Sequence, residues 1–174
     1  MIPCAAGELV KDKDLKFEGR ETMDANTLVQ FKDLGLGAVL ALSAVGSGMG
    51  AGAAGMAAVG AWKKAFAQNK AASFMIVAFV GAPLTQTVYG MIVMNRMVEL
   101  ASKGSYLWGV GILSGLAMGV SAYMQGRAGA VACDAMGETG KGFGNYIVVL
   151  GIIETVALFV MAFTLGLLGK LSGA

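Results

Sequence analysis

The stretch GFGNYIVVLGIIETVALFVMAFTLGLLG, residues 142–169, decides the fold. It lies between Lys141 and Lys170, spans 28 residues and carries a single charge, on Glu154. An α-helix rises about 1.5 Å per residue, so roughly 20 apolar residues are enough to cross the hydrocarbon core of a bilayer. The stretch therefore predicts a transmembrane helix with an acidic side chain near its middle.

Three further runs of the chain carry no charge. They contain 29, 25 and 23 residues and lie at positions 34–62, 71–95 and 104–126. Strands of a membrane β-barrel would alternate apolar and polar residues over about 10 positions, which these runs do not do. We expect an all-α membrane protein whose four transmembrane helices lie at about 28–62, 71–100, 106–136 and 143–170.

The composition excludes several functional classes. Hydrophobic residues make up 56% of the chain and charged residues 14%, against about 25% charged in a soluble domain. The absence of histidine excludes haem ligation and an imidazole proton relay, and Cys4 and Cys133 lack metal-site spacing. A phosphate-binding Gly-Lys-Ser/Thr motif is also missing. We expect a chain that is not itself an enzyme, needs no cofactor and binds no nucleic acid, because its basic residues lie in loops and at helix ends.

Residues 1–24 form a polar segment in which acidic and basic residues alternate. The segment is too polar for a secretory signal, which needs an apolar centre. Two interpretations stay open: a solvated tail, or an upstream extension with Met23 as the true start. We prefer the second, because Met23 leads directly into the first predicted helix.

The chain is an internal duplication of a helical hairpin. The first and third predicted helices match at an offset of 74 residues, and the second and fourth match at an offset of 68. The matched pairs include Gly35 and Gly109, Gly37 and Gly111, Ser47 and Ser121, Gly52 and Gly126, and Gln86 and Glu154. The hairpins occupy residues 25–104 and 105–174. Because each has two crossings, the copies are predicted to be parallel repeats.

Glycine is concentrated in the first and third predicted helices. Glycine costs about 1 kcal/mol in a helix interior relative to alanine, so this density needs a packing reason. A dimerisation stripe would need a spacing of four only, whereas a spacing of two places small residues on more than one face. We expect these two helices to form a crowded inner ring and the bulkier second and fourth helices to face lipid outside it. The glycines predicted to pack in the ring are Gly46, Gly48, Gly50, Gly52, Gly119 and Gly126.

The loop charges predict the orientation. The loop of the first hairpin holds Lys63, Lys64 and Lys70 without an acid, whereas the connection between the hairpins holds Lys103 beside Glu99. By the positive-inside rule, the two hairpin loops face the cytoplasm and both termini lie outside. We expect a multi-pass protein of the cytoplasmic membrane.

Glu154 is the residue most in need of a functional explanation. An acidic side chain in mid-membrane costs about 2.5 to 3.5 kcal/mol on the insertion scale. A permanently protonated acid in a packed core is the alternative, but glutamine would supply the same hydrogen bonds, and Gln86 stands at the equivalent position of the first hairpin. Glu154 is therefore interpreted as the one titratable or cation-binding group of the four helices.

Polar residues near Glu154 in the predicted fold extend this site. Pro83 cannot donate a backbone hydrogen bond and so loosens its helix, and Thr85, Gln86 and Tyr89 share one side of that helix. Gln125 lies among small residues in the third helix. Carboxylate, amide and hydroxyl oxygens suit a hard monovalent cation and not a transition metal. A polar network that only holds the helices together is the alternative.

The duplicated glycine-rich hairpin, the stretch from Pro83 to Gly90, Gln125 and the pair Glu154-Thr155 together resemble the proteolipid (c or K) subunit of bacterial and archaeal V-type ATPases. The resemblance covers residues from about 25 to the end. It implies a Na⁺ ligand set on a membrane rotor ring, with Tyr89 bracing the carboxylate and Pro83 and Thr155 in support. The implied ligands are Glu154, Gln125, Gln86, Thr85 and the backbone carbonyl of Ala82.

The resemblance also implies the partners and the mechanism. Identical subunits form a ring in the lipid bilayer, and a stator subunit with half-channels and an arginine exchanges the ion. A central stalk docks on the loops at residues 63–70 and 137–141. Na⁺ is favoured by the oxygen set, with H⁺ as the alternative. A multidrug exporter with four helices would carry its glutamate in the first helix, and a structural or pore-forming oligomer would leave Glu154 without a purpose.

Overall fold

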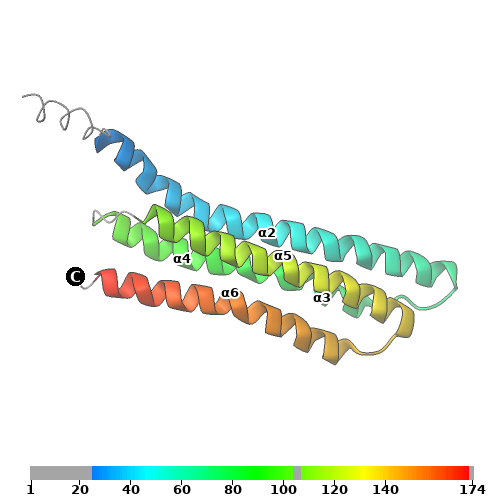
Figure 1. The fold of residues 1–174 in the computed structure, drawn as a ribbon. Coiled ribbons are helices and arrows are strands. Elements are labelled where there is room, and N and C mark those ends of the chain that lie inside the picture. Colours follow the sequence, from blue (N-terminus) through cyan, green and yellow to red (C-terminus); the bar gives the residue numbers. More distant parts are fainter. Residues whose placement is uncertain (1–24, 104–106, 173–174) are drawn as a thin grey trace, which may run out of the picture.

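The computed structural model describes residues 25–103 and 107–172, with side chains from residue 34 onward. The interpretations of residues 1–24, including a start at Met23, lie outside the described residues. The described chain is helical and folds as two hairpins placed side by side (Figure 1). Its elements are α2 (Ala25–Ala67), the 3₁₀ helix η1 (Phe74–Ile76), α3 (Val77–Gly81), the 3₁₀ helix η2 (Ala82–Leu84), α4 (Thr85–Ala101), α5 (Trp108–Thr139) and α6 (Phe143–Ser172).

The short elements from η1 to α4 follow one another as a single segmented helix, so the prediction of four helices is confirmed. The segmentation has its cause in Pro83, which lies within η2. Pro83 has no N–H for the carbonyl of Phe79 one turn earlier. That carbonyl lies against Gly129 of α5, where a Cβ atom would come within 2.8 Å of the Phe79 oxygen. A glycine is therefore needed at the place where the interrupted helix meets α5.

Three helical segments are long and apolar enough to cross a membrane: 34–67, 74–101 and 143–172. Helix α5, with 32 residues, is long enough but is not among them. Its glycines, serines and Gln125 lower its hydropathy, although it runs alongside the other helices (Figure 1). The sequence prediction of four membrane crossings is therefore supported for three helices.

The two glycine-rich helices, α2 and α5, run parallel and pack backbone against backbone. A Cβ atom on Gly46 would lie 1.9 Å from the carbonyl oxygen of Gly119, and one on Gly126 would lie 2.2 Å from the Cα atom of Gly50. These contacts bring together positions 73 and 76 residues apart, close to the 74-residue offset of the repeat. Equivalent parts of the two hairpins thus meet at the centre of the protomer.

The other face of α2 is open. A Cβ atom on Gly48 or Gly52 would meet nothing within 4 Å, and both residues are exposed. The glycines of α2 between positions 46 and 52, which follow one another at every second position, therefore lie on two faces. One face packs against α5, and the other has no contact within the chain. The ring that this pattern predicts, with α2 and α5 inside, stays a prediction.

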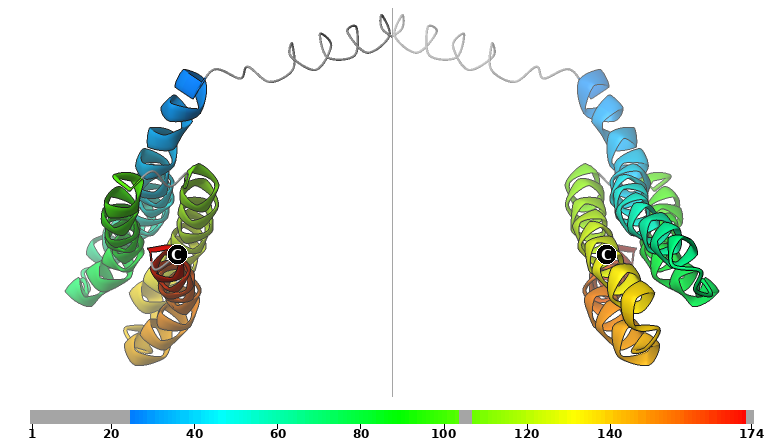
Figure 2. Two further views of the ribbon diagram at one scale, coloured as in Figure 1. Left: turned by 90° about the vertical axis from the view of Figure 1, so that its left-hand side faces the viewer. Right: turned by 90° about the vertical axis from the view of Figure 1, so that its right-hand side faces the viewer.

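The four long helices form two layers, with α2 beside α5 in one and α4 beside α6 in the other. Figure 2 shows the same arrangement from both ends. The two hairpin loops lie together at the end opposite the C-terminus (Figure 1). There Lys64 forms an ion pair with Glu138 and donates a hydrogen bond to it. The hydrogen bond lowers the pKa of the Glu138 carboxyl group. The repeats are thus parallel, as the sequence predicts.

Candidate functional site

Glu154 lies near the middle of α6 and is half-buried. Its carboxylate receives two hydrogen bonds from two other helices. The Tyr89 hydroxyl of α4 donates to Oε1 at 2.7 Å, and Nε2 of Gln125 in α5 donates to Oε2 at 3.4 Å. Each oxygen of the carboxylate is therefore oriented by a separate helix.

Gln125 is the centre of the polar site and is 0% exposed. Besides the bond to Glu154, its Nε2 donates to the Leu150 carbonyl at 3.0 Å, one turn before Glu154 on α6. Its Oε1 accepts a hydrogen bond of 2.7 Å from Nε2 of Gln86, which is also 0% exposed. The two glutamines connect α4, α5 and α6 without contact to solvent.

Thr85 and Ala82 complete the site where η2 gives way to α4. The hydroxyl oxygen of Thr85 lies 3.0 Å from the Ala82 carbonyl and 3.2 Å from Oε1 of Gln86. A hydroxyl has one hydrogen to donate, so these two contacts share it. The oxygens of Ala82, Thr85 and Gln86 thus lie together, and the Gln86 amide joins them to Gln125.

The oxygens of this site are of the kinds that hard cations take as ligands: carboxylate, amide, hydroxyl and backbone carbonyl. The separations of 3.0 and 3.2 Å around the Thr85 hydroxyl are those of ordinary hydrogen bonds. Among the described residues, no cluster of three His, Cys, Asp or Glu side chains could hold a transition metal. One carboxylate with neutral oxygens matches a single positive charge.

The structure therefore brings together six of the eight residues that the sequence singled out for the site: Glu154, Gln125, Gln86, Thr85, Ala82 and Tyr89. Pro83 is buried beside Gly50 of α2 and shapes the backbone around Ala82. Thr155 lies apart, because its hydroxyl donates to the Ile152 carbonyl of its own helix at 2.7 Å.

Two contacts were missed from the sequence. The Leu150 carbonyl accepts from Gln125, and a main-chain acceptor leaves no signal in residue types. The Ser121 hydroxyl donates to the Ile153 carbonyl at 3.1 Å, joining α5 to α6 next to Glu154. The repeat match of Ser121 with Ser47 was the signal that could have found it.

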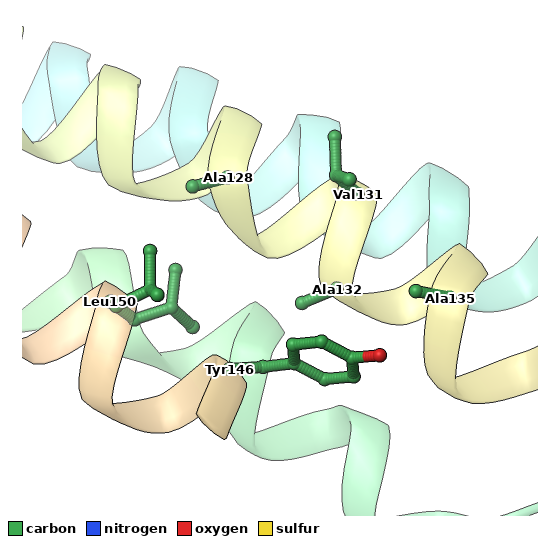
Figure 3. A pocket seen from close by; sticks show the side chains of 7 residues that line it. Ala128, Val131, Ala132, Ala135, Tyr146 and Leu150 are labelled. Carbon is green, nitrogen blue, oxygen red and sulfur yellow. The ribbon is translucent and has the colours of Figure 1, made fainter. Parts of the chain in front are cut away.

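A cavity of about 330 Å³ lies elsewhere, between α5 and α6 (Figure 3). Its lining is apolar except for Tyr146, whose ring lies across the gap toward Ala132. The cavity meets the polar site only through Leu150, whose side chain lines it. It offers no group that could bind an ion.

The comparison with protein families agrees with this geometry. Residues 108–167 match the family model of the ATP synthase C subunit. The matched part includes α5 and most of α6, and so contains Gln125 and Glu154. Over its second hairpin, the chain is therefore similar to the C subunit of ATP synthase. A comparison with curated proteins finds no match.

Proposed function

We propose that this chain is the rotor-ring proteolipid of a V-type ATPase or ATP synthase and that it carries Na⁺ across the membrane on Glu154. The observation that carries the proposal is the cluster formed by the Glu154 carboxylate, the Gln86 and Gln125 amides and the Thr85 hydroxyl. The proposed ligands of Na⁺ are these four side chains and the Ala82 carbonyl. The V-type assignment is supported by the duplicated hairpin with one carboxylate, at Glu154, and an amide at the equivalent Gln86.

The transport step follows from electrostatics. A bare carboxylate is costly in the hydrocarbon core, whereas a carboxylate paired with Na⁺ is neutral overall. Rotation of the ring can therefore carry the loaded site past lipid. At the stator, half-channels and an arginine release and reload the ion, which couples ion flux to ATP hydrolysis or synthesis elsewhere in the complex.

Na⁺ is favoured over H⁺ by the number of oxygens grouped near Glu154. A proton needs only the carboxylate and one hydrogen-bond acceptor, whereas Na⁺ needs several oxygen ligands. The Thr85 hydroxyl lies beside the oxygens of Ala82 and Gln86, and Gln125 joins Gln86 to the carboxylate. A ring coupled to protons stands as the second candidate.

The remaining parts of the proposal concern assembly. Helix α5 crosses the membrane with the other three, because it packs along α2 in the middle of the protomer. Further copies of the chain close the ring against the free face of α2, which includes Gly48 and Gly52. The hairpin loops at residues 63–70 and 137–141 lie on the cytoplasmic side, where the central stalk docks, and both termini lie outside the cytoplasmic membrane.

Carbodiimide labelling of Glu154 in membranes, with and without Na⁺, tests this function. The reagent attacks a protonated carboxyl group, so bound Na⁺ should protect Glu154 at neutral pH and K⁺ at the same ionic strength should not. The variant Glu154→Gln should not be labelled at all and serves as the control for the site. Labelling that depends on pH but not on Na⁺ would replace Na⁺ by H⁺ as the coupling ion.

A further inference from the structure

Ser47 of α2 has a hydroxyl that the fold leaves without a partner. The residue is 1% exposed, and its Oγ is the buried side-chain polar atom without a hydrogen bond among the described residues. An unpaired buried hydroxyl costs free energy, because water no longer satisfies it. Ser43, one turn earlier on the same face, is 0% exposed but donates to the Val39 carbonyl at 2.9 Å. The two serines therefore differ in hydrogen bonding although their burial is nearly equal.

The packing of α2 on the segmented helix places Ser47 opposite Gln86. Two close contacts fix the register of these antiparallel helices. A Cβ atom on Gly50 would lie 3.1 Å from Cβ of Pro83, and a Cβ atom on Gly90 would lie 2.1 Å from the Ser43 hydroxyl oxygen. In both pairs the residue numbers add to 133, and the same sum pairs Ser47 with Gln86. One helical turn separates Ser47 from Ser43 and Gln86 from Gly90, so all four lie on the facing sides.

The Gln86 amide has a hydrogen that the present contacts do not use. An amide nitrogen carries two N–H donors, and Nε2 of Gln86 forms one hydrogen bond, to Oε1 of Gln125. In a site loaded with a cation, the oxygens of both glutamines face the ion. The Gln86 N–H that now bonds to Gln125 Oε1 would then compete with the ion for that oxygen. Ser47 Oγ is an available acceptor on the facing helix.

The second repeat supports a role for this position. Ser121, the equivalent of Ser47, donates to the Ile153 carbonyl directly beside Glu154. Glu154 in turn is the equivalent of Gln86. In each repeat, therefore, the same serine faces the same ion-site position, and its hydroxyl is engaged in the second repeat and free in the first.

We propose that Ser47 is a positioning residue of the ion site, whose Oγ accepts an N–H of the Gln86 amide when the Gln86 oxygen ligates the cation. The inference rests on the proposed Na⁺ function. The contact forms only in the loaded site, so its loss should weaken Na⁺ binding and leave the carboxyl group of the empty site unchanged.

The test compares Ser47→Ala with Ser43→Ala in the intact ring in membranes. The first readout is the Na⁺ concentration that gives half-protection of Glu154 from carbodiimide. One neutral hydrogen bond corresponds to a change of about threefold to tenfold, so Ser47→Ala should raise this concentration by that factor. Ser43→Ala should change it less than about twofold, because its hydroxyl bonds to its own helix. Ser47→Cys keeps the shape of the side chain with a somewhat larger atom but offers only a weak acceptor, and it should behave like Ser47→Ala.

The second readout is the pH profile of labelling without Na⁺, which should be the same in all variants. An unchanged Na⁺ requirement in Ser47→Ala, an equal shift in Ser43→Ala, or a displaced pH profile would each overturn the role of Ser47 and leave the sodium assignment intact. If Na⁺ does not protect the unsubstituted ring, the sodium assignment fails and the role of Ser47 fails with it.

Discussion

The Tyr89 hydroxyl donates a hydrogen bond of 2.7 Å to Oε1 of Glu154 and so joins α4 to α6 across 65 residues of sequence. Tyr89 lies one turn after Gln86 and Thr85 on the same side of α4. The helix that supplies the amide and hydroxyl oxygens therefore also fixes the carboxylate from a different helix. This contact makes the geometry of the site depend on the packing of the two hairpins.

We predict that Tyr89→Phe weakens Na⁺ binding by about tenfold or more, because a hydrogen bond to a charged group contributes at least about 1.5 kcal/mol. The half-protecting Na⁺ concentration in carbodiimide labelling measures the effect. Tyr123→Phe is the matched control, since the Tyr123 ring lies near Arg127 and not at the carboxylate. Equal Na⁺ requirements in the two variants would show that Tyr89 does not hold the site.

Gln125→Ala should have a larger effect than Tyr89→Phe. The substitution removes a proposed ligand oxygen and leaves the buried Gln86 amide without its acceptor, at a cost of about 1–3 kcal/mol for the orphaned donor alone. We expect Na⁺ protection to be weakened by more than about tenfold while Glu154 still reacts with carbodiimide. Gln68→Ala, in the exposed hairpin loop, should leave protection unchanged. Full protection in Gln125→Ala would remove Gln125 from the ligand set.

Gly46→Ala and Gly48→Ala should separate the two faces of α2. The methyl group at position 46 would fall 1.9 Å from the Gly119 oxygen, so the α2 and α5 backbones must move apart. Overpacking of this kind costs about 1–3 kcal/mol. A methyl group at position 48 meets nothing within the protomer. Thermal unfolding of the monomeric chain in detergent, followed by circular dichroism, should show destabilisation in Gly46→Ala only.

An equal loss of stability in both monomeric variants would contradict this division of the glycines. The proposed ring gives a second comparison. If the free face of α2 packs against a neighbouring copy, Gly48→Phe should block ring assembly while the monomer stays helical. Normal rings with phenylalanine at position 48 would show that this face is not an interface.

The helices could be predicted from the sequence because charge is excluded from long runs and apolar residues dominate them. Hydropathy alone does not identify helix α5 as a membrane span. Its glycines, serines and Gln125 lower its hydropathy, and these residues contact α2 and the polar site. The segmentation around Pro83 was predictable in kind, since proline removes a backbone donor. The contact between the Phe79 carbonyl and Gly129 could not be predicted, because it depends on how two helices that are distant in sequence pack together.

Most of the site could also be predicted, because a buried carboxylate and buried amides in a membrane need partners. The repeat match paired Glu154 with Gln86, and helical spacing grouped Thr85, Gln86 and Tyr89. The resemblance placed Thr155 in support of the site, yet its hydroxyl donates to the Ile152 carbonyl of its own helix. Leu150 was not predicted, since its contribution is a main-chain carbonyl. Ser47 was seen only as one half of a repeat match.

The central claim is that one cation binds per chain at Glu154, and equilibrium binding of radioactive sodium to the purified ring tests it most directly. We predict one Na⁺ per chain at saturation in the unsubstituted ring and none in Glu154→Gln, with the ring of the variant still assembled. Bound Na⁺ should be displaced as the pH falls and Glu154 takes up a proton. Absence of Na⁺ binding to the unsubstituted ring, or undiminished binding in Glu154→Gln, would contradict it.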